Sequence, residues 1–342
     1  MVTGRVTLQD VARRAGVSRT TASFVLTGRR DMRISVDAEQ RVLRAARELD
    51  YRPNLTARSL RTKHTQTIGL VSDTIATDAF AGEIIRGSTA AALTRQHLIF
   101  LGETEGDPAT EKRLVQDMLD RGVDGFLYAS MYTREIRIPA ALRGHPVVLV
   151  NCLSRVRAPS VVPDERSAGR TAATALLEAG HRDRVYVVGE SAPHVWAAHH
   201  RRAGIDEAFA SAGTSIAGSI ESPWWPEPAY DAVRAFLAAS RSASGRAPSA
   251  FICLNDRLAF GAYQAAADAG LRVPDDLSVV AFDDSDLASW LRPRLTSLAL
   301  PHFELGRRAV ELLLDGHGPP SAGVHPVTMP LRRRDSIAPP AR

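Results

Sequence analysis

Short runs of aliphatic and β-branched residues alternate with helical patterns from residue 67 almost to the end of the chain. Seven such runs are predicted to be strands: Ile68–Val71, Leu98–Leu101, Gly125–Tyr128, Val147–Val150, Val185–Val188, Ala250–Cys253 and Val279–Phe282. Their apolar residues are continuous, as in strands that are buried on both faces. Such strands separated by helices predict doubly wound parallel sheets in an α/β fold. The segment is long enough for two similar lobes in tandem.

Helical patterns occupy the intervals between these runs. They are expected near Glu83–Arg95, Glu111–Arg121, Ser167–Ala179, Arg201–Ala212, Tyr230–Ala239, Arg257–Ala269 and Phe303–Leu313. Ligands in doubly wound folds bind beyond the carboxyl ends of the strands, where two lobes meet. Polar side chains that follow a strand are therefore candidates for a binding site.

Several polar and aromatic residues occupy such positions. They are Asn151, Asn255, Asp256, Asp283 and Asp284 after strands, Arg201 at a helix start, and Trp224 and Trp225 in a proline-bounded loop. Carboxylate, amide and guanidinium groups beside an aromatic ring suit a polyhydroxylated ligand, because hydroxyls both donate and accept hydrogen bonds. The alternative role is helix capping, which we favour for Asp256 and Asp286.

The first 65 residues are strongly basic. They contain 14 Arg or Lys against 6 Asp or Glu, whereas the remainder contains 29 against 32. A basic head on a mildly acidic body fits nucleic-acid binding, and it also fits a solvated basic face. The choice between them depends on the motif.

Three short helices are predicted in this basic segment. They are expected over Thr7–Ala15, Arg19–Leu26 and Ser35–Leu49. Asp10 can return a hydrogen bond to the cap Thr7, and Gly16 can close the first helix. Their inward residues are expected to be Leu8, Val11, Ala12, Ala15, Ala22, Val25, Leu26, Val42, Leu43, Ala46 and Leu49. Two helices joined by Ala-Gly-Val-Ser and braced by a third are typical of a helix-turn-helix DNA-binding unit.

The first turn of the second helix is the part that reads bases in the major groove. Arg19 has the fork geometry to bind a guanine with two hydrogen bonds, and it could instead hold a phosphate. Thr20 can exchange a hydrogen bond with a base, and Phe24 can contact a thymine methyl group.

A second, shorter helix is predicted after Pro53, with Asn54 as its cap. A helix of barely two turns is unstable alone, so it should order only against a partner and DNA. Leu60 lies between Arg58 and Arg61, which suits a wedge in the minor groove. The alternative is a linker leucine that covers apolar surface.

Residues 7–62 resemble the DNA-binding headpiece of the lactose-repressor (LacI/GalR) family. The matching patterns are T-L-Q-D-V-A-x-x-A-G-V-S and Y-x-P-N-x-x-A-R-S-L. The resemblance implies a homodimer on a near-palindromic double-stranded operator. It places Arg19, Thr20 and Phe24 at base-reading positions, Thr7, Ser18, Thr21, Ser35, Tyr51 and Asn54 at phosphate contacts, and Ala57 and Leu60 in the minor-groove helix. Thr27–Arg33 departs from the pattern because it is longer and more basic.

The resemblance extends over the rest of the chain and implies a two-lobe sensor of the periplasmic-binding-protein type I fold. The matching stretches are Asn255–Ala262, Gly270–Pro274, Phe282–Asp284, Leu291–Thr296 and Glu304–Gly306. The effector-binding set implied by residues and resemblance together is Asp73, Phe80, Asn151, Arg201, Trp224, Asn255 and Asp283. Two departures reshape the pocket: Ala81 replaces an aromatic residue, and Asn151 stands where an aspartate is common.

Other classes of function lack their signatures in the sequence. No apolar run approaches the roughly 20 residues of a membrane helix, and residues 1–5 begin no signal peptide. Cys152 and Cys253 are predicted to be reduced core residues. No phosphate-binding loop, nucleophile elbow or metal-binding spacing is present, and His194, His199 and His200 lack partner ligands. We expect a soluble cytoplasmic protein that is neither an enzyme nor dependent on a metal or cofactor.

The predicted domains are a helix-turn-helix unit over 1–52, a hinge over 53–66 and a sensor over 67–342. A small sugar-like effector is expected to change the angle between the lobes and thereby order or release the hinge helices. Whether it induces or co-represses is left open. Pro319–Arg342 contains no leucine heptad, which favours a dimer over a tetramer. A sugar-uptake binding protein and an enzyme fused to a DNA-binding head are the rival classes.

Overall fold

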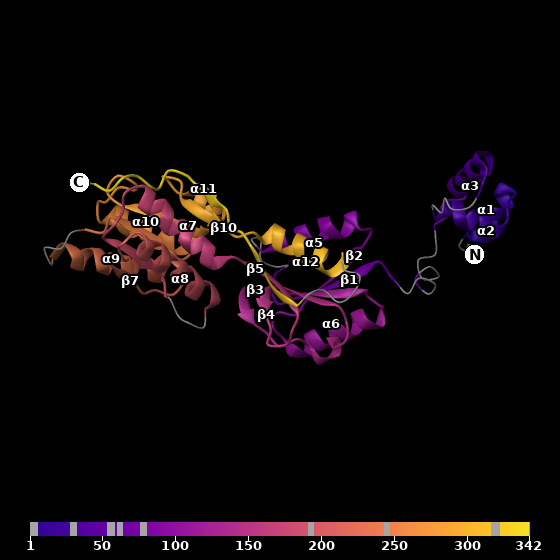
Figure 1. Ribbon diagram of the computed structural model, residues 1–342, viewed down its shortest axis with the longest axis horizontal. Helices are drawn as coiled ribbons and strands as arrows, with labels where there is room; N and C mark the ends of the chain where they lie inside the picture. The colour runs from indigo at the N-terminus through magenta and orange to yellow at the C-terminus, as the bar shows by residue number, and fades with distance from the viewer. Residues whose placement is uncertain are drawn as a thin grey trace. The chain divides into compact units, whose positions relative to one another are not determined.

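The computed structural model describes residues 6–27, 33–52, 59, 64–75, 81–190, 195–242, 247–315 and 322–341. The chain divides into two compact units, Met1–Thr65 and Gln66–Arg342 (Figure 1). The predicted hinge over 53–66 lies outside the described residues except for Ser59 and 64–66, so its bounds stay a prediction. None of the described helices is both long and apolar enough to cross a membrane.

The described part of the first unit includes the three helices that the sequence predicts over residues 7–49: α1 (Leu8–Ala15), α2 (Arg19–Leu26) and α3 (Val36–Glu48). The capping box at Thr7 and Asp10 forms, and Gly16 closes α1 with a left-handed φ of 65°. The helices share a core of Val11, Ala12, Ala15, Ala22, Val42 and Ala45.

One predicted inward residue of α3 is wrong. Leu43 is 39% exposed, whereas Ala45 is buried. The buried stripe runs through Val42, Ala45 and Ala46 at helical spacing, and Leu43 lies about 100° around the helix from Val42.

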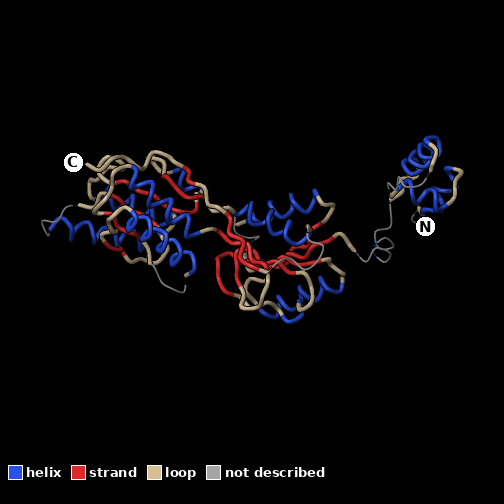
Figure 2. Tube along the Cα trace, viewed as in Figure 1, coloured by secondary structure: helices blue, strands red, loops and turns tan. Residues whose placement is uncertain are grey.

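The second unit contains two six-stranded sheets. The first has the order β11-β5-β4-β3-β1-β2 and is entirely parallel. Its strands are β1 (Thr67–Ser72), β2 (Leu98–Glu103), β3 (Gly125–Glu135), β4 (Val147–Leu153), β5 (Pro159–Pro163) and β11 (Gly323–Val327). Helices α5 (Gly82–Thr94) and α12 (His302–Leu314) cover one face, and α6 (Pro108–Asp120) covers the other (Figures 1 and 2). A short 3-10 turn, η1, spans Ala140–Leu142.

The second sheet has the order β12-β10-β9-β8-β6-β7 and is parallel except for β12. Its strands are β6 (Val185–Val188), β7 (Gly218–Ile220), β8 (Ala250–Cys253), β9 (Ser278–Asp283), β10 (Thr296–Ala299) and β12 (Leu331–Arg332). Its helices are α7 (Glu165–Glu178), α8 (Trp196–Ser211), α9 (Pro226–Ser242), α10 (Asp256–Asp268) and α11 (Asp286–Trp290).

The two lobes are not in tandem, which corrects the sequence prediction. The chain leaves the first sheet after β5, returns as α12 and β11, and then ends in the second sheet as β12. Two of these crossings lie side by side, because the Asp164 N–H donates to the carbonyl of Val327 at 2.9 Å. Each lobe is therefore completed by segments that are distant in sequence.

Reciprocal glycines bring two helix pairs into backbone contact. A Cβ on Gly87 of α5 would lie 1.9 Å from the Phe303 carbonyl oxygen of α12, and one on Gly306 would lie 2.0 Å from that of Ile84. In the second lobe, a Cβ on Gly204 of α8 would lie 1.9 Å from the carbonyl oxygen of Arg166 in α7. Only a glycine permits such close approach without displacing backbone.

Candidate functional site

The amino-terminal end of α2 is exposed and carries the residues that are predicted to read bases. Ser18 caps this helix by accepting a hydrogen bond from the Thr21 N–H at 3.0 Å. Arg19 and Thr20 follow in the first turn and are both exposed, while Phe24 is half-buried one turn later. The structure thus presents the three predicted base-reading residues on one short helix.

Three helix starts in this unit are capped by hydroxyl side chains. Thr7, Ser18 and Ser35 accept from the N–H groups of Asp10, Thr21 and Ala38. A helix amino terminus carries partial positive charge, which favours a phosphate. Thr21 bonds to Ser18 and the half-buried Tyr51 packs on the core, whereas Asn54, Ala57 and Leu60 lie outside the described residues.

In the first lobe, Asp73 follows β1 and holds an irregular part of β3. Its carboxylate accepts from the Met131 N–H at 2.9 Å and from the Arg134 guanidinium at 3.0 Å. Asn151 of β4 is buried, donates to the carbonyls of Ser130 and Met131 at 3.0 Å, and accepts from Thr133. Both predicted residues therefore fix the segment where the register of β3 shifts. The third predicted residue of this lobe, Phe80, is outside the described residues.

In the second lobe, Arg201 of α8 is 2% exposed and is held on two sides. Its Nε donates to Glu165 Oε2 at 2.6 Å, and its Nη2 donates to Glu165 Oε1 at 3.1 Å. Nη1 donates to the Leu254 carbonyl. The guanidinium also lies over Phe282, 4.5 Å from the ring centroid.

Asp283 ends β9 beside this guanidinium. Its Oδ1 lies 3.7 Å from Arg201 Nη1, and its side chain is 20% exposed. Burial raises the pKa of the Asp283 carboxyl well above its usual range; Arg201 opposes that rise, and Asp256 and Glu165 add to it. The φ of Asp283 is 108°, a left-handed backbone conformation that is rare for a residue with a side chain.

The cap of α10 is Asn255 and not, as the sequence suggested, Asp256. Asn255, predicted as an effector residue, caps α10 by accepting from the Leu258 N–H at 2.8 Å, and its effector role stays a prediction. Asp256, interpreted as a cap, instead accepts from Ser285 N and Oγ at 2.7 and 2.8 Å and from Ser297 Oγ at 2.7 Å. Asp286 is likewise the first residue of α11, and Ser285 holds the capping position. In both helices the residue before the expected one has the extended backbone of a cap.

Trp224 and Trp225 lie close to the guanidinium groups of different arginines. The Trp224 ring lies 5.7 Å from the Arg201 guanidinium, and its Nε1 donates to the Glu190 carbonyl at 3.3 Å. Trp225 is 56% exposed, and the guanidinium of Arg257 lies 4.8 Å from its ring centroid. An aromatic face therefore borders the polar cluster.

Glu165 is the site residue that the sequence reasoning missed. It follows β5, whose short Pro-Ser-Val-Val-Pro sequence was not predicted as a strand. Its position at a strand end was therefore hidden. A signal was present, because two acidic residues, Asp164 and Glu165, follow an aliphatic pair and a proline.

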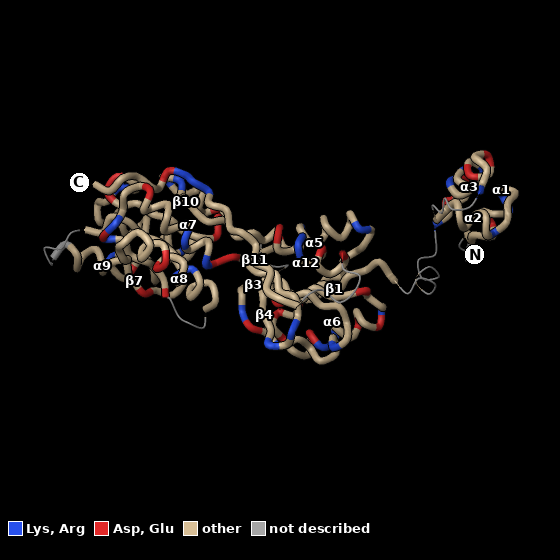
Figure 3. The backbone as a smooth tube through the Cα atoms, in the orientation of Figure 1, with Lys and Arg blue, Asp and Glu red and all other residues tan. Residues whose placement is uncertain are grey.

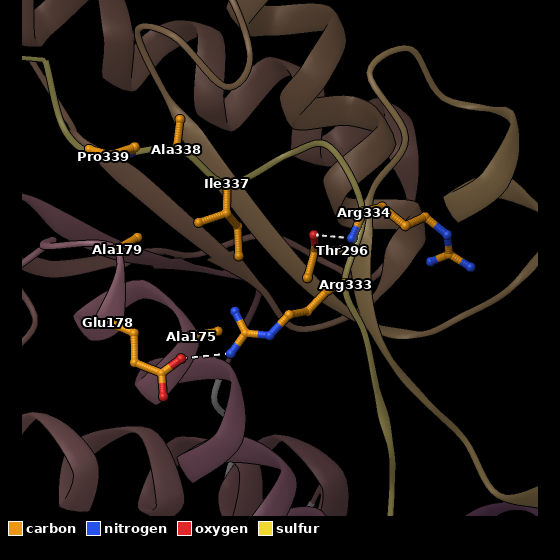
Figure 4. A pocket seen from close by; sticks show the side chains of 9 residues that line it. All are labelled: Ala175, Glu178, Ala179, Thr296, Arg333, Arg334, Ile337, Ala338 and Pro339. Atoms are coloured by element: carbon orange, nitrogen blue, oxygen red, sulfur yellow. Dashed lines mark hydrogen bonds and ion pairs between the residues drawn. The ribbon is translucent and has the colours of Figure 1, made fainter.

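A separate open pocket of about 260 Å³ lies near the carboxyl terminus (Figure 4). Its lining includes Glu178, Thr296 and Arg333, and Arg333 Nη2 donates to Glu178 at 2.6 Å. The basic run Arg332–Arg334 lies beside β10 (Figure 3). The lining contains none of the predicted effector residues. No group of His, Cys, Asp and Glu suited to a metal ion occurs among the described residues.

Comparison with known families matches both units of the chain. Residues 7–54 match the model of bacterial regulatory proteins of the lacI family, and residues 160–337 match a periplasmic binding protein-like domain. The ribose operon repressor of Haemophilus influenzae is 32% identical over 313 residues, which cover 90% of this chain and 91% of the relative. Catabolite control protein A of Priestia megaterium is 31% identical over 312 residues, again 90% and 91% of the two chains.

Solved structures share the fold. The lac repressor dimer bound to operator and the anti-inducer ONPF aligns with a TM-score of 0.75 at 24% identity, covering 98% of this chain and 99% of that one. The complex of the transcriptional regulator CelR with cellobiose aligns with a TM-score of 0.64 at 27% identity, covering 97% and 100%. A regulator from Enterococcus faecium with bound ribose aligns with a TM-score of 0.61 at 25% identity, covering 80% and 99%. The chain belongs to the lacI family of bacterial regulatory proteins.

Proposed function

We propose that this DNA-binding transcription regulator is a homodimeric repressor that acts on a near-palindromic operator in the cytoplasm. Its affinity for the operator is controlled by a small sugar-like effector, and the proposal includes no catalytic step. The observation that carries it is the capped, exposed amino terminus of α2, which presents Arg19 and Thr20. Its membership of a family of DNA-binding regulators supports the same assignment.

The proposed DNA contacts fall into two classes. Arg19, Thr20 and Phe24 would read base edges, because a helix of this size fits the major groove by its first turns. Thr7, Ser18 and Ser35 stand at helix starts that favour phosphate, with Thr21 and Tyr51 adjacent. Asn54, Ala57 and Leu60 would act in the hinge, with Leu60 as a wedge in the minor groove.

The proposed effector site lies at the carboxyl edges of the two sheets. Asp73, Phe80 and Asn151 would contribute from the first lobe, and Arg201, Trp224, Asn255 and Asp283 from the second. A carboxylate, an amide and an aromatic ring suit a ligand with many hydroxyl groups. Relatives of similar fold that hold ribose or cellobiose support this class of effector.

The test begins with selection of operators from a library of random DNA duplexes by the purified full-length chain. We expect a two-fold symmetric consensus, and an affinity that falls steeply as salt rises because bound phosphates release counterions. A binding protein for sugar uptake would select no symmetric sequence. Failure to enrich any sequence would therefore reject the proposed function.

A further inference from the structure

We propose that the effector site at the edge of the second sheet takes a neutral or cationic ligand that donates hydrogen bonds, and excludes anions such as sugar phosphates and sugar acids. The inference deepens the proposed function and rests on it, because it assigns the charge class of the effector. It depends on how three buried charged groups are paired.

The positive charge of Arg201 is already neutralised inside the protein. Glu165 holds the guanidinium with two hydrogen bonds, and both side chains are only 2% exposed. The third nitrogen donates to the Leu254 carbonyl. An anionic ligand would have to compete with a buried, bidentate carboxylate, and leaving that carboxylate unpaired would be strongly unfavourable.

Asp283 is the group at this edge that lacks donors. Among the described residues, no N–H or O–H group donates to its carboxylate, and Arg201 Nη1 lies at 3.7 Å, beyond hydrogen-bond length. Apart from a proton that it holds itself, the Asp283 carboxyl only accepts hydrogen bonds, so its natural partner is a hydroxyl or an ammonium group of a ligand. An anion placed there would be repelled by Glu165, and it would make the ionisation of Asp283 still less favourable.

Arg257, the other arginine near Asp283, does not make the site attractive to anions. The guanidinium of Arg257 lies over the Trp225 ring, and no ion pair joins it to a carboxylate in the described part of the chain. Asp256 is fully buried and satisfied by two serines. The charge of Arg257 favours the ionised form of Asp283, while Arg201 is paired with Glu165 and Arg334 with Asp284.

The experiment uses probes that share a scaffold and differ in charge. Binding of glucose, glucosamine, glucuronate and glucose 6-phosphate, and of ribose and ribose 5-phosphate, is measured by calorimetry on the full-length chain. We expect a neutral or amino member to bind, and its anionic partner to bind at least about tenfold more weakly, as one lost charged hydrogen bond would produce. An anionic member that binds as tightly as its neutral partner would overturn the proposal. Binding by none of the probes would overturn it as well.

A pair of matched variants separates the charge of the site from general stability. Glu165→Gln leaves Arg201 with an uncompensated charge, so discrimination against glucose 6-phosphate or ribose 5-phosphate should shrink by about tenfold. Glu207→Gln is the same change at the surface, where Glu207 of α8 pairs with Arg166 and Arg170 of α7. It should leave the discrimination as it is. Unchanged discrimination in Glu165→Gln, with an intact melting temperature, would contradict the role of the Arg201–Glu165 pair.

Operator binding is measured on the same preparations. If the chain selects an operator but prefers anionic probes, the proposed function stands and the inference about charge fails. If it selects no operator, the proposed function fails whatever the probes do. A folding defect in Glu165→Gln would appear as a lowered melting temperature, and the wild-type panel alone then decides the question.

Discussion

Asp256 is fully enclosed and accepts three hydrogen bonds, two from Ser285 and one from Ser297. Burial raises the pKa of its carboxyl from 3.8 to about 6, although these hydrogen bonds act in the opposite direction. This buried carboxyl joins the start of α11, through Ser285, to β10, through Ser297. It also makes the stability of the second lobe depend on pH in an unusual direction.

The folded chain holds the Asp256 proton more tightly than the unfolded chain between about pH 4 and pH 6. The contribution of this group to the free energy of unfolding should therefore fall as pH rises through that window. We expect the stability of the wild type relative to Asp256→Asn to decrease from pH 4 to pH 6 and to level off above it. Urea unfolding at several pH values measures this, with Asp206→Asn, an exposed aspartate of α8, as the control. A difference that rises with pH would contradict the assignment.

Arg19 is the residue whose replacement separates base reading from phosphate binding. Arg19→Ala should weaken operator binding by about 1–3 kcal/mol and relax the preference at a single base pair. Arg13→Ala, an arginine of α1 whose side chain is 75% exposed, provides the control. Competition binding against operators mutated at each position measures both effects. Uniform weakening across all sequences would make Arg19 a phosphate contact.

At the scale of elements, the helix pairs α5–α12 and α7–α8 are both packed through glycines. Glycines on facing helices allow the backbones to touch, and in α7–α8 this contact lies within one turn of Arg201. The spacing Arg201-x-x-Gly204 thus joins a charged site residue to the packing that positions it. A change at the glycine should reach the site through the helix.

Gly204→Ala would place a methyl group 1.9 Å from the Arg166 carbonyl oxygen and force α7 and α8 apart. We expect a loss of about 1–3 kcal/mol in the free energy of unfolding, as for other overpacked contacts. Gly82→Ala in α5 is the matched control, because nothing lies within 4 Å of the added atom. Chemical denaturation of both variants measures the difference. Equal stabilities would show that the helix pair yields without strain.

The sequence predicts the elements that are long or continuously apolar. All seven predicted strands and all seven predicted helices of the sensor are present. The missed strands are short, polar or interrupted by proline: β5, β7, β10, β11 and β12. Their strand conformation depends on pairing with distant segments, which local periodicity does not report.

Only part of the candidate site is predicted, again because some of its residues depend on pairing with distant segments. Polar residues after long strands, such as Asp283, stand out in the sequence, and Arg201 stands out by its resemblance. Glu165 pairs with Arg201 across 36 residues, and it is the first residue of α7, just after an unpredicted strand. The roles of Asn255 and Asp256 depend on where α10 begins, and a shift of one residue decides which of them is the cap.

At the scale of the whole molecule, the proposed homodimer requires two half-sites about one helical turn apart, roughly 34 Å. Insertion of about 5 base pairs between the half-sites turns one of them to the opposite face of the duplex. Operator affinity should then fall towards the nonspecific level, while the same insertion outside the half-sites leaves it unchanged. Gel-shift titration measures both. An affinity indifferent to the central insertion would indicate that each 37.0 kDa chain binds alone.

Because the chain crosses between the sheets three times, α12 and β11 belong to the lobe that begins with β1. Leu305, Ala309 and Val310 of α12 belong to the core that covers the first sheet, which starts at residue 67. A truncation after residue 301 would therefore damage the first lobe although it removes residues that lie more than 200 positions after the start of that lobe. Folding of that lobe has to wait until α12 has been synthesised. The headpiece, in contrast, draws its core from within its first 51 residues and is free to fold as soon as it emerges.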